Sequence, residues 1–302
     1  MSNISRVLST DIEVERFVDG VLEMSESPNK REAINSISAA ERNILKYDRF
    51  STWIKEDCRD YEWRDDKIRR KLRKQIIEEL YTLNRLDNDD DITLKSGGSA
   101  PKCEPKYDKK AIYIIGPHAS GKSTISSIIA DIYGAHIVDS DFAKRKLPEY
   151  TNQIGSASLV HEESRHLVFD TEGDSLISRC FQNGNNIVVP KIGDNLDDIL
   201  EFTKSLKSID YSVYLISIDL DRQKATQRAY NRYISTKRYV PLSLIFDKYG
   251  NEPTLNYFKI KQRYSSMFEG FAQISTDVPY GTPSTTIEVE NMDEISNVEW
   301  RR

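Results

Sequence analysis

The 302-residue chain has few cysteines, no excess of basic residues and no long apolar run. Its three cysteines (Cys58, Cys103 and Cys180) are too scattered for a disulfide framework, which indicates a reducing compartment. Lys and Arg number 43 against 48 Asp and Glu, and this net charge of −5 argues against nucleic acid as a partner. No stretch approaches the roughly 18 apolar residues of a membrane helix, and "MSNISRVLST" is no signal segment, so we expect a cytoplasmic protein without a membrane partner. Delivery into another cell stays open.

The composition and the hydrophobic pattern of the chain change near residue 100. Residues 11–86 are charged and mostly helical in pattern, with an apolar stripe at three- and four-residue steps between Ile68 and Leu83. The segment that follows is rich in Asp, Lys, Gly and Pro. We therefore expect a small helical N-terminal domain at 1–95, which is a candidate regulatory region, and a linker at 96–110.

The rest of the chain, 111–302, alternates between short apolar runs and longer amphipathic segments. Such alternation predicts an α/β fold with a mostly parallel sheet flanked by helices, of the P-loop kinase type. Strands are expected at 111–115, 135–139, 186–190 and 211–219, and helices after the first strand and at 159–183, 194–209 and 222–234.

The segment "GPHASGKST" matches the phosphate-binding pattern G-x4-G-K-[ST] in full. An apolar run precedes it and an amphipathic segment follows it, as a strand–loop–helix phosphate site requires. The pattern predicts that Lys122 reaches the β- and γ-phosphates of ATP or GTP and that Ser123 holds Mg²⁺. The expected nucleotide-binding residues are Gly116, Pro117, His118, Ala119, Ser120, Gly121, Lys122, Ser123 and Thr124.

Two carboxylates follow the second expected strand in "IVDSDF". Because ligands of open α/β sheets lie beyond the carboxyl ends of the strands, Asp139 and Asp141 are expected to face the γ-phosphate. A carboxylate there can take the proton of an attacking hydroxyl. The alternative is that one of the two only caps the next helix.

A basic segment, "QRAYNRYISTKRYVP", brings Arg228, Arg232, Lys237 and Arg238 together before Pro241. In small-molecule kinases such a segment forms a lid whose arginines neutralise the transferring phosphate. The alternative is an ordinary solvated helix face.

The segment "LVHEESRH" combines Glu162 and Glu163 with two histidines. Its spacing matches no common zinc pattern. We interpret it as a substrate-facing helix, and the alternative is a surface helix with ordinary charges.

Taken in order, the P-loop, "DSDFAKRKLPEY", the expected long helix, "NGNNIVV" and the arginine segment resemble the zeta toxin family of bacterial kinases over residues 109–241. The family phosphorylates the sugar 3′-hydroxyl of UDP-N-acetylglucosamine, and helical antitoxins hold its members inactive. The resemblance implies that Asp141 is the general base and that Arg228 and Arg238 contact phosphate. It also implies a toxin or effector role and an antitoxin partner. The helical N-terminal region is a candidate to take the place of that antitoxin in cis, and the alternative is a docking domain for some other partner.

The chain departs from the family where the sugar is bound. The substrate-binding Glu before the third strand is replaced by Asp174, and a Glu-Gly-Thr element by Pro190-Lys191-Ile192. In these departures the chain resembles zeta-like plant-pathogen effector kinases that phosphorylate NAD. The expected activity is thus transfer of a γ-phosphate to a hydroxyl of a nucleotide-type molecule, with UDP-N-acetylglucosamine or NAD as acceptor.

Two other classes remain open at this point. One is a P-loop kinase that acts on another metabolite or a polynucleotide end, and the second is a non-catalytic, nucleotide-dependent interaction protein. The carboxylate Asp141 and the lid arginines favour an enzyme, since a switch protein needs no base beyond the second strand.

Overall fold

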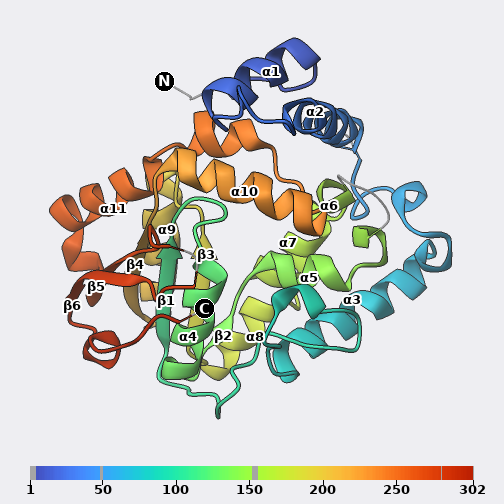
Figure 1. The fold of residues 1–302 in the computed structure, drawn as a ribbon. Coiled ribbons are helices and arrows are strands. Elements are labelled where there is room, and N and C mark those ends of the chain that lie inside the picture. Colours follow the sequence, from blue (N-terminus) through green and yellow to red (C-terminus); the bar gives the residue numbers. More distant parts are fainter. Residues whose placement is uncertain (1–4, 48–49, 152–155, 280, 302) are drawn as a thin grey trace.

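A computed structural model describes residues 5–47, 50–151, 156–279 and 281–301 of the chain. Its centre is a six-stranded sheet in the order β2-β3-β1-β4-β5-β6, in which the first five strands of that order run parallel and β6 pairs antiparallel with β5 (Figure 1). The strands are β1 (Lys110–Ile115), β2 (His136–Ile137), β3 (Ile187–Lys191), β4 (Ser212–Asp219), β5 (Gly270–Ser275) and β6 (Thr285–Glu290). The predicted fold class is confirmed.

The burial of each strand follows its place in the sheet. β1, in the middle, is buried at every position after Lys110, as expected for a parallel strand covered on both faces. The edge strand β6 has no buried residue. β6 and its neighbour β5, which pair antiparallel with each other, both lie in the last third of the chain, for which the sequence pattern predicted no strands.

Eleven α-helices surround the sheet in the described part of the chain. They are α1 (Asp11–Gly20), α2 (Lys30–Tyr47), α3 (Asp66–Thr82), α4 (Lys122–Tyr133), α5 (Ser140–Lys146), α6 (Ser156–Leu159), α7 (His161–Phe169), α8 (Leu176–Asn183), α9 (Leu196–Ser208), α10 (Arg222–Thr236) and α11 (Glu252–Arg263). The chain also forms a short 3-10 turn, η3 (Asp89–Asp91), and a π-helical segment, η5 (Leu244–Tyr249).

The single helix predicted over 159–183 is wrong. The chain turns at Asp170, whose Oδ1 accepts from the backbone N–H groups of Glu172 and Gly173. A new helix, α8, then begins at a capping box in which Ser175 and Ser178 satisfy each other's backbone N–H groups. The local side-chain hydrogen bonds of Asp170, Ser175 and Ser178 thus interrupt the helix, although the apolar residues keep helical spacing through the segment.

The N-terminal helices belong to two different hydrophobic clusters. Leu72, Ile76 and Leu80 of α3 are buried in the main core together with the strands, and α3 contacts α5, α7 and α8. In contrast, α1 and α2 form a second cluster with α10 and with residues 239–245, and Figure 1 shows them lying over α10. The first 95 residues therefore cover the kinase-like fold at two places.

Part of the segment predicted as a linker is buried. Residues 97–101 are buried against α3, and a Cβ on Gly98 would come within 2.1 Å of the carbonyl oxygen of Leu83 and 2.5 Å of that of Glu79. Glycine is required there because backbone approaches backbone. The boundaries at 95 and 110 stay a prediction.

Candidate active site

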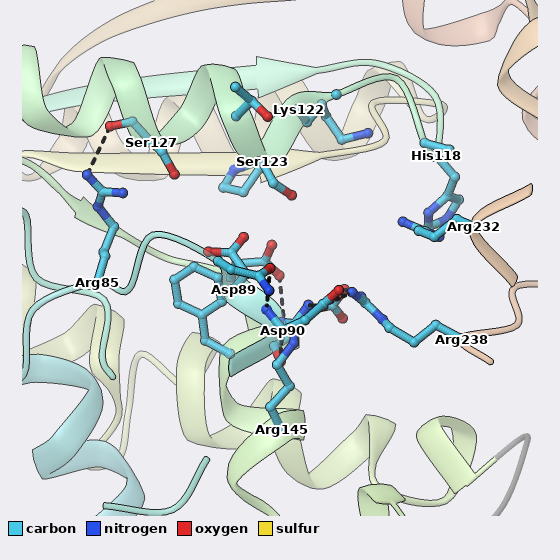
Figure 2. A pocket seen from close by; sticks show the side chains of 18 of the residues that line it. Arg85, Asp89, Asp90, His118, Lys122, Ser123, Ser127, Arg145, Arg232 and Arg238 are labelled. Atoms are coloured by element: carbon cyan, nitrogen blue, oxygen red, sulfur yellow. Dashed lines mark hydrogen bonds and ion pairs between the residues drawn. The ribbon is translucent and has the colours of Figure 1, made fainter. Parts of the chain in front are cut away.

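A cavity of about 1260 Å³ opens at the carboxyl ends of β1 and β3. The phosphate-binding loop lines it on one side, α5 on another, and residues 228–238 on a third (Figure 2). Ligand pockets usually measure about 300–1,000 Å³, so this cavity has room for a nucleotide and a second molecule of similar size.

The loop between β1 and α4 has the shape that phosphate binding needs. Ala119 and Gly121 have positive φ angles of 57° and 83°, which turn the loop back on itself. Gly116 lies so close to β4 that a Cβ would approach the Ile218 carbonyl oxygen to 2.9 Å. At the start of α4 the side chain of Ser123 is exposed toward the cavity (Figure 2).

Lys122 lies across the loop. Its Nζ donates to the carbonyl oxygens of Gly116 at 2.7 Å and Pro117 at 2.6 Å. Burial lowers the pKa of Lys122 to about 7, and Arg232 adds to the shift while Asp139 opposes it. Burial and Lys122 likewise lower the pKa of His118, which lines the cavity beside Tyr249, to about 3.

Both predicted carboxylates line the cavity, but they have different contacts. Asp139 is the N-cap of α5, and its Oδ1 accepts from the backbone N–H of Asp141 at 2.9 Å. Burial and the adjacent Asp141 carboxylate raise the pKa of Asp139. The side chain of Asp141 is 44% exposed and its Oδ1 is 2.7 Å from the Lys144 amine. Although burial opposes it, the charges of Lys144 and Arg145 hold the pKa of Asp141 well below its usual range.

The three predicted arginines also line the cavity. Arg228 donates through Nη2 to the Thr276 carbonyl oxygen at 2.8 Å, after β5. The Nε of Arg232 is buried with no hydrogen-bond partner among the described residues, and burial lowers its pKa. Arg238 lies 4.0 Å from Asp141 Oδ2 and donates to Asp90 Oδ1. Lys237 has a positive φ of 61°, which ends α10 and reverses the direction of the chain before Arg238.

The remaining predicted substrate residues are not brought to this cavity. Glu163 is buried and its carboxylate accepts from Arg69 and Arg73 of α3, while Arg69 also binds Glu149. Asp174 accepts from Arg179 at 2.8 Å. Glu162, one residue before Glu163 on α7, is absent from the cavity lining as well.

Several cavity residues escaped the sequence analysis. They include Lys144, Arg145 and Arg165, the N-terminal segment Arg85 to Asp90, Val278 after β5, and Arg301 at the end of the described chain. Arg145 is on the face of α5 that the pattern "DSDFAKRK" presents four residues after Asp141, so helical spacing could have found it. The segment from Arg85 to Asp90 carried no such signal, because its mostly polar residues follow Leu83, the last position of the apolar stripe.

The charge of the cavity differs from that of the chain. Eleven Lys and Arg side chains line it against seven Asp, although the chain as a whole carries −5. Lys191 is one of these cations, with its Nζ 3.3 Å from the centre of the Phe169 ring, and burial lowers its pKa to about 8. Such a concentration of positive charge attracts anionic substrates. The fold and this loop together define a P-loop phosphotransferase.

Comparisons with known proteins agree with this class. The profile of the Zeta toxin family matches residues 97–264. A structure from the PezAT chromosomal toxin–antitoxin system of Streptococcus pneumoniae superposes with a TM-score of 0.54 at 16% identity, covering 80% of this chain and 86% of that one. The AvrRxo1-ORF1:-ORF2 structure with ATP gives a TM-score of 0.48 at 17% identity, over 73% of this chain and 67% of that one. No curated protein matches significantly.

The chain belongs to the Zeta toxin family, since the match covers more than half of its residues. It is therefore a P-loop kinase of a family that binds ATP. Among the described residues no helix is both long and apolar enough to span a bilayer.

Proposed function

We propose that this protein transfers the γ-phosphate of ATP, or of GTP, to a hydroxyl group of a nucleotide-type small molecule. The observation that carries the proposal is the shared cavity. The phosphate loop with Lys122, the open carboxylate of Asp141 and the arginines after β4 all line one space. Phosphoryl transfer needs little more than positioning, a proton acceptor and cations around the moving phosphate.

Each residue has a role in this proposal. Lys122 holds the β- and γ-phosphates, Asp141 orients the acceptor hydroxyl and takes its proton, and Arg228 and Arg238 neutralise the transferring group. A carboxylate of low pKa suits a loose transition state, in which the proton moves late. Asp139 then supports the site through its bond to the Asp141 backbone.

Mg²⁺ fits the donors at this place. Oxygen ligands are what the ion prefers, and the Ser123 hydroxyl and the Asp139 carboxylate both line the cavity. The described residues contain no group of three or more His, Cys, Asp or Glu that could hold a metal by themselves. This suits an ion held jointly with nucleotide phosphates, whose negative charge the ion would neutralise.

The acceptor is proposed to be UDP-N-acetylglucosamine or NAD. Pro190, Lys191 and Ile192 line the cavity where the family has its Glu-Gly-Thr element, and Pro190 and Ile192 offer no side-chain hydrogen bond to a sugar. A site that lacks such groups discriminates poorly among sugars, so we expect NAD to compete.

We also propose that the region 1–95 regulates the kinase and that the activity is that of a toxin or effector. The support is the packing of α1 and α2 on α10, the helix that leads to Arg238. The toxin–antitoxin system to which the S. pneumoniae structure belongs points the same way. An antitoxin from another chain is the alternative partner.

The test is to incubate the protein with labelled ATP and a cell metabolite extract, and to identify by mass spectrometry which molecule gains a phosphate. UDP-N-acetylglucosamine and NAD are then supplied singly, with the Lys122→Ala variant as control. If a different metabolite or a polynucleotide end carries the label, that molecule is the acceptor in place of UDP-N-acetylglucosamine or NAD. Nucleotide binding without transfer to any acceptor would leave a non-catalytic interaction protein and reject the kinase proposal.

A further inference from the structure

A turn from the N-terminal region reaches into the cavity. Asp90, in η3, accepts through one carboxylate oxygen from two guanidinium groups, Arg145 at 3.1 Å and Arg238 at a shorter distance. Figure 2 shows both bonds and places Asp89 and Asp90 between the start of α4 and Arg145. Arg145 belongs to α5 and Arg238 to the segment after α10, so this carboxylate joins two elements that also meet through Arg238 and Asp141, 4.0 Å apart.

The turn is anchored on both sides of Asp90. Arg85 donates to the Ser127 carbonyl oxygen at 3.0 Å and to Asp131 at 2.5 Å, both on α4. On the other side Ile92 is buried in the main core. Between these anchors the side chain of Asp90 is 36% exposed, and a small movement of the turn would withdraw its carboxylate.

Arg145 and Arg238 are arranged as a binding site for an anion. The side chain of Arg145 is only 6% exposed, and its Nη1 bonds to the Asp141 backbone oxygen, which fixes the direction of Nη2. Arg238 and Arg232 approach from the opposite side, and both interact with Asp141 and Asp90. Planar guanidinium groups converging on one oxygen suit a phosphate at least as well as a carboxylate.

We propose that Arg145 and Arg238 form a phosphate subsite in which Asp90 competes with a phosphate group of a substrate. This rests on the proposed function only in that the cavity takes phosphorylated substrates. Asp90 lies outside the residues 97–264 that match the family, so this competitor belongs to the chain's own N-terminal region. A substrate phosphate must displace it, so the apparent affinity is the intrinsic affinity multiplied by the fraction of molecules in which the turn is withdrawn.

The test measures binding rather than turnover. Inorganic pyrophosphate is titrated into the full chain by calorimetry, using wild type, Asp90→Asn and, as the matched control, Asp91→Asn, whose carboxylate is absent from the cavity lining. The amide in Asp90→Asn keeps the shape of the side chain but loses the charge, so pyrophosphate should bind about tenfold more tightly, while the Asp91 variant stays at the wild-type value. The gain should vanish when Arg238→Gln is combined with Asp90→Asn.

Two pairs of nucleotide probes identify which phosphate the subsite takes. If it is the γ-phosphate, Asp90→Asn tightens a non-hydrolysable ATP analogue but not ADP; if it belongs to the acceptor, NAD or UDP-N-acetylglucosamine gains instead. Unchanged or weaker pyrophosphate binding in a variant that melts like wild type would overturn the proposal, and weaker binding would make Asp90 a positioning residue. A gain in binding without phosphate transfer to any acceptor would reject only the kinase function.

Discussion

Asp139 and Asp141 are two residues apart, yet the start of α5 separates their chemistry. One oxygen of Asp139 is committed to the Asp141 backbone, whereas the Asp141 side chain is open to the cavity beside Lys144. The hydrogen bond that Asp139 accepts from the Asp141 backbone N–H suits a supporting role for Asp139. The open carboxylate is the one that can meet a hydroxyl.

The first prediction separates these two carboxylates. Asp141→Asn keeps its shape but takes no proton, so phosphate transfer should fall by about 10²–10⁴ with nearly unchanged ATP affinity. Asp139→Asn can still accept from the Asp141 backbone but loses its charge, so it should weaken Mg²⁺ or nucleotide binding as well. Single-turnover kinetics and equilibrium binding distinguish them, and the reverse pattern would mean that the base is Asp139.

The second prediction concerns the proton on Lys122. Burial lowers its pKa to about 7, so the amine is mostly neutral at pH 8 and protonated at pH 6. Phosphate charge favours the protonated form, so ATP binding should take up close to one proton at pH 8 and few at pH 6. Calorimetry in buffers of different ionisation enthalpy measures this uptake. Equal uptake at both pH values, or uptake that survives in Lys122→Met, would assign the proton to another group.

At the scale of elements, α3 holds two other elements in place through buried charge. Arg69 is fully buried and binds Glu149, after α5, and Glu163 of α7, and Arg73 adds a second ion pair to Glu163. Burial of so many charges is tolerated only when every group has a partner. This network explains how a sequence pattern that suggested a substrate helix also serves packing.

The third prediction tests this network. Arg69→Met leaves the buried Glu149 without a cation and leaves Glu163 with Arg73 alone, so it should lower the free energy of unfolding by about 3–5 kcal/mol. Glu163→Gln should destabilise the fold with little change in the KM of a folded enzyme, while Glu162→Gln, the neighbouring control, should change neither. Denaturant unfolding and steady-state kinetics provide the comparison. A raised KM in Glu163→Gln with full stability would instead support the predicted substrate contact.

The fourth prediction concerns the contact between α3 and the segment that follows it. Gly98→Ala places a Cβ against two carbonyl oxygens, and such overpacking costs about 1–3 kcal/mol or more. Gly20→Ala, at the end of α1, meets no atom within 4 Å and should be neutral or slightly stabilising. Thermal melting of both variants is the measurement. Equal melting temperatures would show that the segment relaxes easily and behaves as the flexible linker that its composition suggests.

At the scale of the whole molecule, the two hydrophobic clusters determine which N-terminal segments can be deleted without unfolding the rest of the chain. Deleting everything before residue 96 would take Leu72, Ile76 and Leu80 out of the main core, so that fragment is expected to be unstable. The helices α1 and α2 pack on α10 in a cluster of their own and can be removed without opening the main core.

The fifth prediction uses that difference. A chain that starts at Ser51 keeps α3 and the buried ion pairs but frees one face of α10. If α1 and α2 restrain the lid, it should transfer phosphate faster, or be more toxic when expressed, than the full chain. Circular dichroism establishes that it is folded. Equal rates for two folded proteins would remove the regulatory role of these helices, and a slower rate would give them a supporting one.

Local chemistry explains why much of the kinase core could be predicted from sequence. The phosphate loop needs only nine consecutive residues between a strand and a helix, and both β1 and α4 form where the apolar spacing placed them. Lys122, Asp139, Asp141 and the three arginines also line the cavity as expected, because the carboxyl ends of parallel strands open to the same edge of the sheet.

Only the tertiary structure decided which polar residues share a space. Asp90 meets Arg145 and Arg238 from 55 and 148 residues away, and Glu163 is paired with Arg69 across 94 residues. Apolar periodicity carries no information on such contacts, since a charged residue looks the same in a sequence whether it faces water, a buried partner or a substrate. The sequence by itself thus determined the class of chemistry and the loop that holds the phosphates. Which charges share the cavity depended on the folding of the N-terminal region over the cavity and over α10.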